Sequence, residues 1–323
     1  MTTKRMGAAI CALAAGLMAG GQAVAQETLT WLEWWDPEYG EDVMDELVAG
    51  FEAETGIRVE RTAVPWDNMF ELLVSNARAG TADYDVLGME AEWLTAIDRL
   101  GGLEPLDAYL EKDAAFAETL TDSTLVRWRD SVLMMNWYIF PYSYTYNVGL
   151  LEEAGVEPPS GWDEVVSVSE QIADSSSAEA GIGVLFNESG ADYLPYYLFG
   201  SRLAQAGGRF FDDDGNAVFN SPEGVAALEW WMALNDSGVV APGAFGVSKG
   251  QLREQFATGK IAAMWDGPFA STIAKQTNPD INVAYAPAWC DETCGYQWGG
   301  SGLAISANTE KKDAAWQFIK YLL

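Results

Sequence analysis

Strand-like and helix-like segments alternate over residues 28–100, and this alternation constrains the fold more than any other feature of the sequence. A β-prone run at 28–34 precedes a helical pattern at 41–55, which Gly56 ends in the usual position for a terminating glycine. Two further strand–helix pairs are predicted at 57–64 with 66–79 and at 84–88 with 92–100. Such alternation predicts a mostly parallel sheet with helices on both faces.

A second unit with the same kind of pattern begins near Tyr146, and 323 residues are enough for two domains. Ser221 and Pro222 have the form of a helix N-cap followed by an N1 proline. The strands predicted in the rest of the chain lie at 183–186, 261–265 and 302–306, and the helices at 160–173, 223–235, 249–258 and 311–323.

The sequence contains no histidine, which excludes a Ser-His-Asp triad, a Cys-His pair and a His-ligated zinc. The 48 acidic residues against 18 basic ones give a net charge of −30, which repels nucleic acids and anionic membrane surfaces. A hydrophobic fraction of 49% predicts a folded core in spite of this charge. We expect neither a metal nor a cofactor.

The N-terminus has the pattern of a secretory signal peptide. Lys4 and Arg5 precede a small, apolar stretch at 7–21, and Ala25 ends a small-residue cleavage site. The stretch is short and rich in Ala and Gly, which disfavours the alternative of a membrane-spanning helix. Cys11 lacks the small preceding residue typical of a lipidated cysteine, so the exported protein is not expected to carry a lipid anchor.

Two cysteines remain after cleavage, and they are separated by only three residues. In an exported chain, Cys290 and Cys294 are predicted to form a local disulfide. So short a loop removes little chain entropy, so its contribution to stability falls below the usual ~2–4 kcal/mol.

Aromatic and acidic residues gather near the predicted strand ends, where ligands bind in parallel α/β sheets. Flat rings stack on the C–H faces of sugars while carboxylates accept their hydroxyl protons, so this combination favours a carbohydrate site. For any single ring, burial in a core is an equally open alternative. The rings include Trp34, Trp35, Trp66, Trp93, Trp137, Tyr138, Tyr142 and Phe269, and the acids are Glu33, Asp36, Asp67, Glu90, Glu92 and Asp266.

Paired carboxylates could instead cleave glycosides, but 48 acids make pairs unavoidable and the pattern unspecific. The glycine-rich stretch 299–302 lacks the Lys-Ser/Thr of a phosphate-binding loop, and close backbone approach to a ligand or a hinge explains it better. No catalytic constellation stands out.

Several segments resemble the family 1 extracellular solute-binding proteins of ABC importers, the maltose-binding-protein-like group. They occur in the family's order across nearly the whole exported chain. They are Phe51-Glu-Ala-Glu-Thr-Gly-Ile57, Asp83-Tyr-Asp-Val86, Gly102-Leu-Glu-Pro-Leu-Asp107, Tyr146 to Gly155 with Pro159 to Glu164, Asp214 to Gly224, Phe256 to Phe269 and Ala314 to Ile319.

The resemblance implies a two-lobed periplasmic-binding-protein fold of class II, with a mostly parallel sheet flanked by helices in each lobe and a ligand cleft between the lobes. It divides the chain into a signal peptide (1–25), an N-terminal lobe (26–140 with 299–323) and a C-terminal lobe (141–298). Members of the family usually continue past the equivalent of Leu323. The chain is therefore expected to be either a fragment, with the closing helices of the C-terminal lobe outside this sequence, or an unusually short member.

The resemblance also assigns ligand-facing positions, at strand ends and at the two crossovers near 140–146 and 298–303. These candidates are Glu33, Trp35, Asp36, Met89, Glu92, Asn136, Trp137, Tyr138, Asp266, Phe269, Gly299, Gly300 and Ser301. The acids Glu33, Asp36, Glu92 and Asp266 would accept sugar hydroxyls, while Trp35, Trp137 and Phe269 would stack on the sugar.

The predicted function is therefore a monomeric periplasmic receptor that closes on a mono- or oligosaccharide and delivers it to the ABC permease in the inner membrane, without catalysis. Three alternatives remain open. They are a secreted glycoside hydrolase or lyase, a lectin-like surface module, and a receptor for a polyamine or another non-sugar solute, since rings and acids also bind cations.

Overall fold

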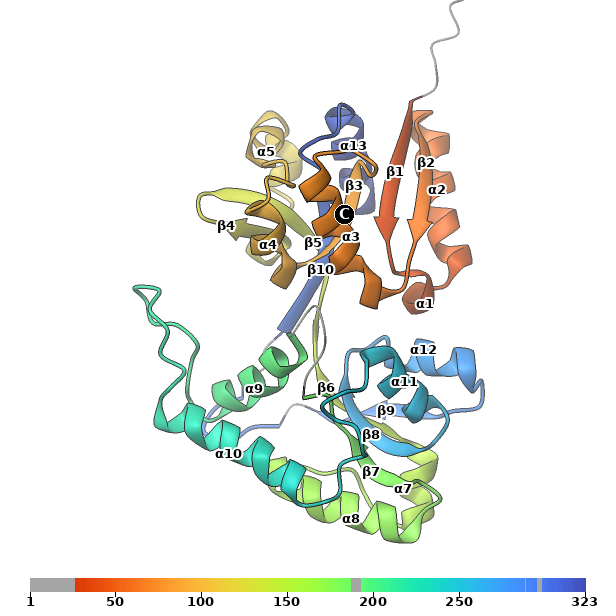
Figure 1. The fold of residues 1–323 in the computed structure, drawn as a ribbon. Coiled ribbons are helices and arrows are strands. Elements are labelled where there is room, and N and C mark those ends of the chain that lie inside the picture. The colour runs from red at the N-terminus through yellow and green to blue at the C-terminus, as the bar shows by residue number, and fades with distance from the viewer. Residues whose placement is uncertain (1–26, 187–192, 288, 295–297) are drawn as a thin grey trace, which may run out of the picture.

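The computed structural model describes residues 27–186, 193–287, 289–294 and 298–323, so the predicted signal peptide lies outside the described residues. The described strands form a six-stranded sheet in the order β2-β1-β3-β10-β5-β4 and a four-stranded sheet in the order β7-β8-β6-β9. Each sheet has its own helices and hydrophobic core, and the two units lie one above the other in Figure 1. We call them the first and the second lobe.

The first lobe contains most of the N-terminal half of the chain and also its last strand and helix. Its strands are β1 (Thr28–Glu33), β2 (Arg58–Ala63), β3 (Val86–Glu90), β4 (Leu125–Trp128), β5 (Ser131–Pro141) and β10 (Trp298–Ile305). Its helices are α1 (Asp36–Tyr39), α2 (Glu41–Thr55), α3 (Trp66–Ala79), α4 (Leu94–Asp98), α5 (Asp107–Lys112), α6 (Ala114–Ala117) and α13 (Lys312–Leu322), with short 3₁₀ turns η1 (Ala91–Trp93) and η2 (Asp122–Thr124).

The second lobe is built from the middle of the chain. Its strands are β6 (Ser143–Asn147), β7 (Ala180–Gly183), β8 (Ile261–Asp266) and β9 (Val283–Tyr285). Its helices are α7 (Val148–Ala154), α8 (Val165–Ser175), α9 (Tyr193–Gln205), α10 (Pro222–Asp236), α11 (Lys249–Ala257) and α12 (Ala270–Thr277), with the 3₁₀ turn η3 (Trp162–Glu164).

Local sequence signals explain where several helices begin and end. Gly56 ends α2 in a left-handed conformation that suits glycine, with φ of 75°. The side chain of Ser221 accepts a hydrogen bond at the start of α10, as the sequence predicts. Ser248 and Gln251 form a reciprocal capping box at the start of α11. The Ser248–Gln251 capping box fixes the start of α11, the helix that carries Lys249 and Arg253 toward the first lobe.

The predicted two-lobed α/β architecture is confirmed, but the expectation of mostly parallel sheets is wrong. In the first lobe β1 pairs in parallel with β2 and β3, whereas β10 runs antiparallel to β3 and β5, and β4 antiparallel to β5. In the second lobe, of the described pairings, β7 with β8 is parallel, and β6 pairs antiparallel with β8 and β9. The cause is topological, because β4 and β5 form a hairpin and β10 returns from the other lobe.

The chain passes between the lobes along two neighbouring strands. It leaves the first sheet at the end of β5 and enters the second sheet with β6, with only Tyr142 between the two strands. β10 brings the chain back and pairs with β5 along its length, from Trp298 opposite Pro141 to Leu303 opposite Met135. Figure 1 shows β10 extending from the first lobe toward the second. The exact lobe limits at residues 140 and 299 remain a prediction.

Cys290 and Cys294 form the predicted disulfide, with their Cα atoms 4.3 Å apart. Within the described ranges, no helix has both the length and the apolar character needed to cross a membrane.

Candidate ligand cleft between the lobes

A cavity of about 320 Å³ lies between the two lobes. The helices α1 and α12 touch along one edge of it, where Gln276 Nε2 donates a hydrogen bond of 2.7 Å to the carbonyl oxygen of Pro37. Residues from both lobes line the cavity: Trp34, Pro37, Glu38, Pro65, Trp66 and Asp67 from the first, and Lys249, Gly250, Arg253, Glu254, Ala257, Ile273, Gln276 and Thr277 from the second.

Glu90 stands at the end of β3, beside the cavity, and both of its carboxylate oxygens are engaged. Oε1 accepts a hydrogen bond of 2.9 Å from the indole nitrogen of Trp66, and Oε2 accepts one of 2.9 Å from the hydroxyl of Ser301. Burial, and to a smaller extent the charge of Glu92, raise the pKa of Glu90 to about 8, while the charge of Lys249 opposes the shift. The carboxyl group is therefore held close to its neutral form.

Glu92, in the 3₁₀ turn after β3, links the lobes directly. Its carboxylate accepts a hydrogen bond from the hydroxyl of Tyr197 on α9. The Tyr197 ring stacks on Tyr142, with centroids 4.8 Å apart, and the Tyr142 hydroxyl accepts a hydrogen bond of 2.9 Å from Lys249. Burial raises the pKa of Glu92. A first-lobe acid is thus joined to a second-lobe cation through two tyrosines.

Lys249 and Arg253 lie one turn apart on α11. Arg253 makes a bidentate pair with Asp266 at the end of β8, with N–O distances of 2.7 and 2.9 Å. Its guanidinium also lies 4.8 Å from the ring centre of Phe269. The predicted ligand groups Asp266 and Phe269 therefore lie together at the lobe interface, and a cation of the protein already contacts both.

One arginine pairs with acids at the end of β1, in α1 and in α2. Arg61 on β2 pairs with Glu33 at 2.6 Å, with Asp36 at 2.5 Å and with the exposed Asp45 at 2.8 Å. Glu33 is fully buried, and burial raises its pKa to about 7. The structure thus places Glu33 and Asp36 in an ion-pair network beside α1.

An aromatic cluster follows β1 and supports the cavity wall. Trp35 is fully buried and packs edge-to-face against Trp137, with centroids 4.9 Å apart. Its indole nitrogen donates to the Tyr138 hydroxyl at 2.9 Å, which in turn donates to Glu38 at 2.7 Å. The prediction that Trp35 offers a face to a sugar is not supported by this packing, which makes it part of the core.

The other predicted positions lie on β3, β5 and β10. Met89 is fully buried in β3, and Asn136 Nδ2 donates to the carbonyl oxygen of Ser123 at 2.8 Å. Gly299 and Gly300 are buried, and a Cβ on Gly299 would lie 2.9 Å from the ring of Phe140. This glycine stretch therefore lies close to side chains of the protein, and its predicted approach to a ligand stays a prediction.

Sequence reasoning missed the second-lobe cations. The cavity is lined by Lys249 and Arg253, and also by Glu38, which sequence reasoning did not single out. Tyr197, also missed, links the lobes through its hydrogen bond to Glu92. The spacing of Lys249 and Arg253 by four residues on one helix, just before the recognised stretch ending in Phe269, is the signal that could have identified them.

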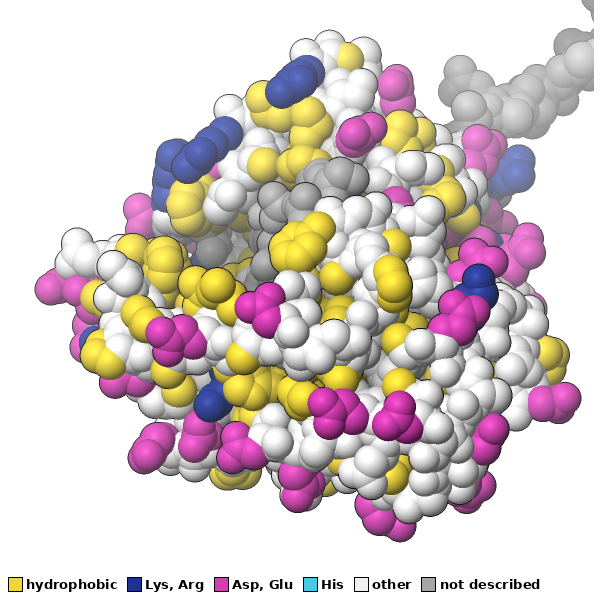
Figure 2. Space-filling view, turned by 60° about the horizontal axis from the view of Figure 1, so that its bottom comes forward, with side chains coloured by type: hydrophobic (Ala, Val, Ile, Leu, Met, Phe, Trp, Pro, Cys, Tyr) yellow, Lys and Arg dark blue, Asp and Glu magenta, His cyan; other side chains and the backbone are white. Residues whose placement is uncertain are grey.

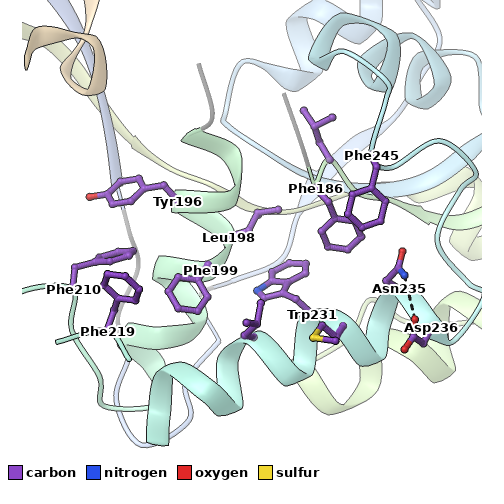
Figure 3. Close-up of a pocket in the computed structure, with 13 residues that line it drawn as sticks. Phe186, Tyr196, Leu198, Phe199, Phe210, Phe219, Trp231, Asn235, Asp236 and Phe245 are labelled. Carbon is purple, nitrogen blue, oxygen red and sulfur yellow. Dashed lines mark hydrogen bonds between the residues drawn. The ribbon is translucent and has the colours of Figure 1, made fainter. Parts of the chain in front are cut away.

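A second pocket, with different chemistry, lies elsewhere. It is an apolar groove of about 620 Å³ on the second lobe, where Phe199 and Phe210 lie on one side, Phe186 and Phe245 on the other, and Trp231 of α10 between them (Figure 3). Hydrophobic side chains gather on the face of the second lobe shown in Figure 2, with acidic side chains around them. The groove has little polar lining, which separates it chemically from the cavity between the lobes.

The fold agrees with the comparison with known proteins. The sequence profile described as bacterial extracellular solute-binding protein matches residues 37–323. The chain belongs to this family. The match confirms the family resemblance derived from the sequence motifs.

Similar proteins of known name are binding proteins. A binding protein of Brucella abortus is 28% identical over 290 residues, which cover 86% of this chain and 67% of the relative. The diacetylchitobiose binding protein of Streptomyces coelicolor is 26% identical over 322 residues, or 95% of this chain and 72% of the relative. Both relatives therefore contain chain that has no counterpart here.

Solved structures show the same fold. An ABC transporter solute-binding protein from Thermotoga lettingae, bound with α-D-tagatose, superposes with a TM-score of 0.78 at 25% identity, covering 92% of this chain and 77% of that protein. A solute-binding protein from Agrobacterium radiobacter in complex with ribitol has a TM-score of 0.70 at 24% identity over 92% of this chain and 76% of that protein.

Proposed function

We propose that this protein is the extracytoplasmic receptor of an ABC importer and binds a neutral carbohydrate or polyol between its lobes. The observation that carries this proposal is the cavity of about 320 Å³ whose walls come from both lobes. A ligand there would contact both lobes at once and so favour the closed state, which is how a solute shifts the lobe equilibrium. The permease would recognise that state.

The chemistry of the walls supports a polyhydroxyl ligand. Of the two lining rings, Trp34 is buried, so the partly exposed Trp66 supplies the ring surface, while Glu38, Asp67 and Gln276 supply acceptors and a donor for hydroxyl groups. Two of the similar proteins bind sugars by name or as solved, diacetylchitobiose and tagatose. The volume lies at the lower end of the range typical of small-molecule sites, which favours a small ligand.

The alternatives are less well supported. Lys249 and Arg253 bring two positive charges to the cavity, which disfavours a polyamine. A hydrolase or lyase would need an acid/base pair, whereas Glu33, Glu90 and Asp266 are each engaged by the protein itself. A lectin-like module would not need closure of two lobes. We further propose export through the signal peptide to the periplasm, without a lipid anchor, and a monomeric state.

The longer relatives suggest a role for the apolar groove of the second lobe. The tagatose-bound protein has 77% of its length covered by 92% of this chain. We propose that, in a longer form of this protein, chain following residue 323 covers the groove, consistent with the predicted closing helices of the C-terminal lobe. Leu228 and Met232, both more than half exposed on α10, would become buried there.

A thermal-shift screen with tagatose, ribitol, mannitol and diacetylchitobiose tests the ligand class. A ligand present at 100 times its dissociation constant adds about 2.7 kcal/mol to the free energy of unfolding, which is readily detected. A stabilising ligand should be recovered intact and should reduce the radius of gyration in small-angle X-ray scattering. Cleavage of the sugar, or binding without compaction, would contradict the receptor function.

A further inference from the structure

The side chain of Lys249 ends inside a set of aromatic rings contributed by both lobes. Its Nζ lies 4.4 Å from the ring centre of Trp66, 5.5 Å from that of Tyr142 and 5.7 Å from that of Phe269. Cations within about 6 Å of a ring centre are attracted by its quadrupole, and more strongly when water is excluded. Lys249 is only 5% exposed, so this ammonium group is largely desolvated. We call these three rings the ammonium cage.

Acidic groups complete the cage. Glu90 accepts the indole N–H of the caging Trp66, and Glu92 accepts the hydroxyl of Tyr197, which stacks on the caging Tyr142. The positive charge of Lys249 lowers the pKa values of Glu38, Glu90 and Glu92 against the upward effect of burial. Three carboxyl groups of the first lobe are thus coupled to one ammonium of the second.

Rings with nearby carboxylates form the kind of site that binds amines. Here the protein supplies the amine itself, on a helix whose start is fixed by the Ser248–Gln251 capping box. A second ammonium entering this region would meet the charges of Lys249 and Arg253, which already lie against the rings of Trp66 and Phe269. A neutral hydroxyl ligand meets no such repulsion.

We infer that Lys249 is the specificity-determining residue of the cleft: it fills an ammonium-binding cage and thereby excludes cationic solutes. The exclusion of cationic solutes rests on the proposed role of the cleft as the ligand site. The cage itself does not, because it is defined by contacts within the protein.

Chemical complementation tests the cage. Lys249→Ala removes three carbons and the ammonium group, and propylammonium replaces them atom for atom. In the K249A protein, propylammonium at ten times its dissociation constant should raise the thermal midpoint saturably by about 2 °C. The wild type and the matched variant Lys275→Ala, at an exposed position on α12, should not respond. Neither should K249A respond to 1-propanol, which has the same shape without the charge.

The outcomes are decisive in both directions. Folded K249A that does not respond to propylammonium, or that responds equally to 1-propanol, would overturn the cage. If K249A does not fold alone, refolding from urea with 50 mM propylammonium should recover it, and failure to do so would also contradict the inference. Trp66→Leu in the K249A background should abolish the response, because the nearest ring is then missing.

The ligand class is tested separately on the wild type. Putrescine should give no saturable thermal shift, and a shift would show that Lys249 does not exclude cations, whatever sugars do. If neither putrescine nor any neutral sugar or polyol binds while K249A still responds to propylammonium, the proposed function fails and the cage stands.

Discussion

At the scale of single residues, the main effect is that acidic side chains between the lobes, above all Glu90, are buried. Glu90 has a pKa raised from its ordinary value of 4.5 to about 8, because burial disfavours the carboxylate. Its two hydrogen bonds, from Trp66 and Ser301, hold it in place but do not remove this cost. Between pH 4.5 and 8 the folded protein binds more protons than the unfolded chain, so the contribution of Glu90 to stability falls as the pH rises.

Glu90→Gln should relieve this pH dependence. The amide keeps an acceptor for Trp66 and carries no charge, so the variant should gain stability over the wild type as the pH increases from 5 to 8. Since one pKa unit corresponds to about 1.4 kcal/mol, we expect a gain of roughly 1–3 kcal/mol in urea unfolding. Glu60→Gln on the exposed side of β2 is the control and should show little change. An equal difference at both pH values would disprove the prediction.

At the scale of secondary-structure elements, β10 is the element on which both the fold and the site depend. It lies between β3 and β5 in the first sheet, and it supplies Ser301 to Glu90. A register shift occurs between Ser301 and Gly302, where β10 pairs with β5. A Cβ on Gly302 would lie 1.9 Å from the carbonyl oxygen of Met135, so glycine is required there.

Gly302→Ala should therefore destabilise the first lobe. The overlap is with backbone, which cannot move aside as a side chain can, and we expect a loss of about 3 kcal/mol or more in the free energy of unfolding. Gly161→Ala is the matched control, since Gly161 has extended backbone and open space around its Cβ position. Urea unfolding of both variants checks this, and a G302A protein as stable as G161A would contradict the close packing.

At the scale of the whole molecule, the cavity between the lobes and the groove on the second lobe differ in chemistry. The cavity between them is lined by charged and aromatic residues, whereas the groove on the second lobe is almost entirely apolar (Figures 2 and 3). Exposed apolar patches of this kind commonly mark a contact surface. If further chain covers the groove, a charged substitution in the groove should destabilise the longer form more than the 323-residue chain.

Met232→Glu distinguishes a covered groove from an open one. In the 323-residue chain, Met232 is 57% exposed, so the free energy of unfolding of the variant should differ from that of the wild type by no more than about 0.5 kcal/mol. In the longer form proposed above, the same change would bury a charge and cost several kcal/mol. Val43→Glu on exposed α2 should have the same effect in both lengths. An M232E effect independent of length would refute the proposal.

The sequence alone determined much of the architecture. Helices α2 and α3 begin and end at the predicted residues because amphipathic spacing and a terminal glycine are local signals. The order of the family motifs identified the two-lobed fold, and two closely spaced cysteines in a chain with a signal peptide identified the disulfide. Candidate acids such as Glu92 and Asp266 were found at strand ends, and both lie at the lobe interface.

Only the tertiary structure decided the direction of the strands and the partners of the site residues. Strand direction depends on where β10 inserts, which is a contact between residues more than 150 positions apart in sequence. Likewise, Trp35 is buried by other residues of the first lobe, and Trp66 faces a cation of the second lobe, so both outcomes depend on tertiary contacts. Local propensity carries no information about such contacts, because burial and charge pairing arise from the assembled fold.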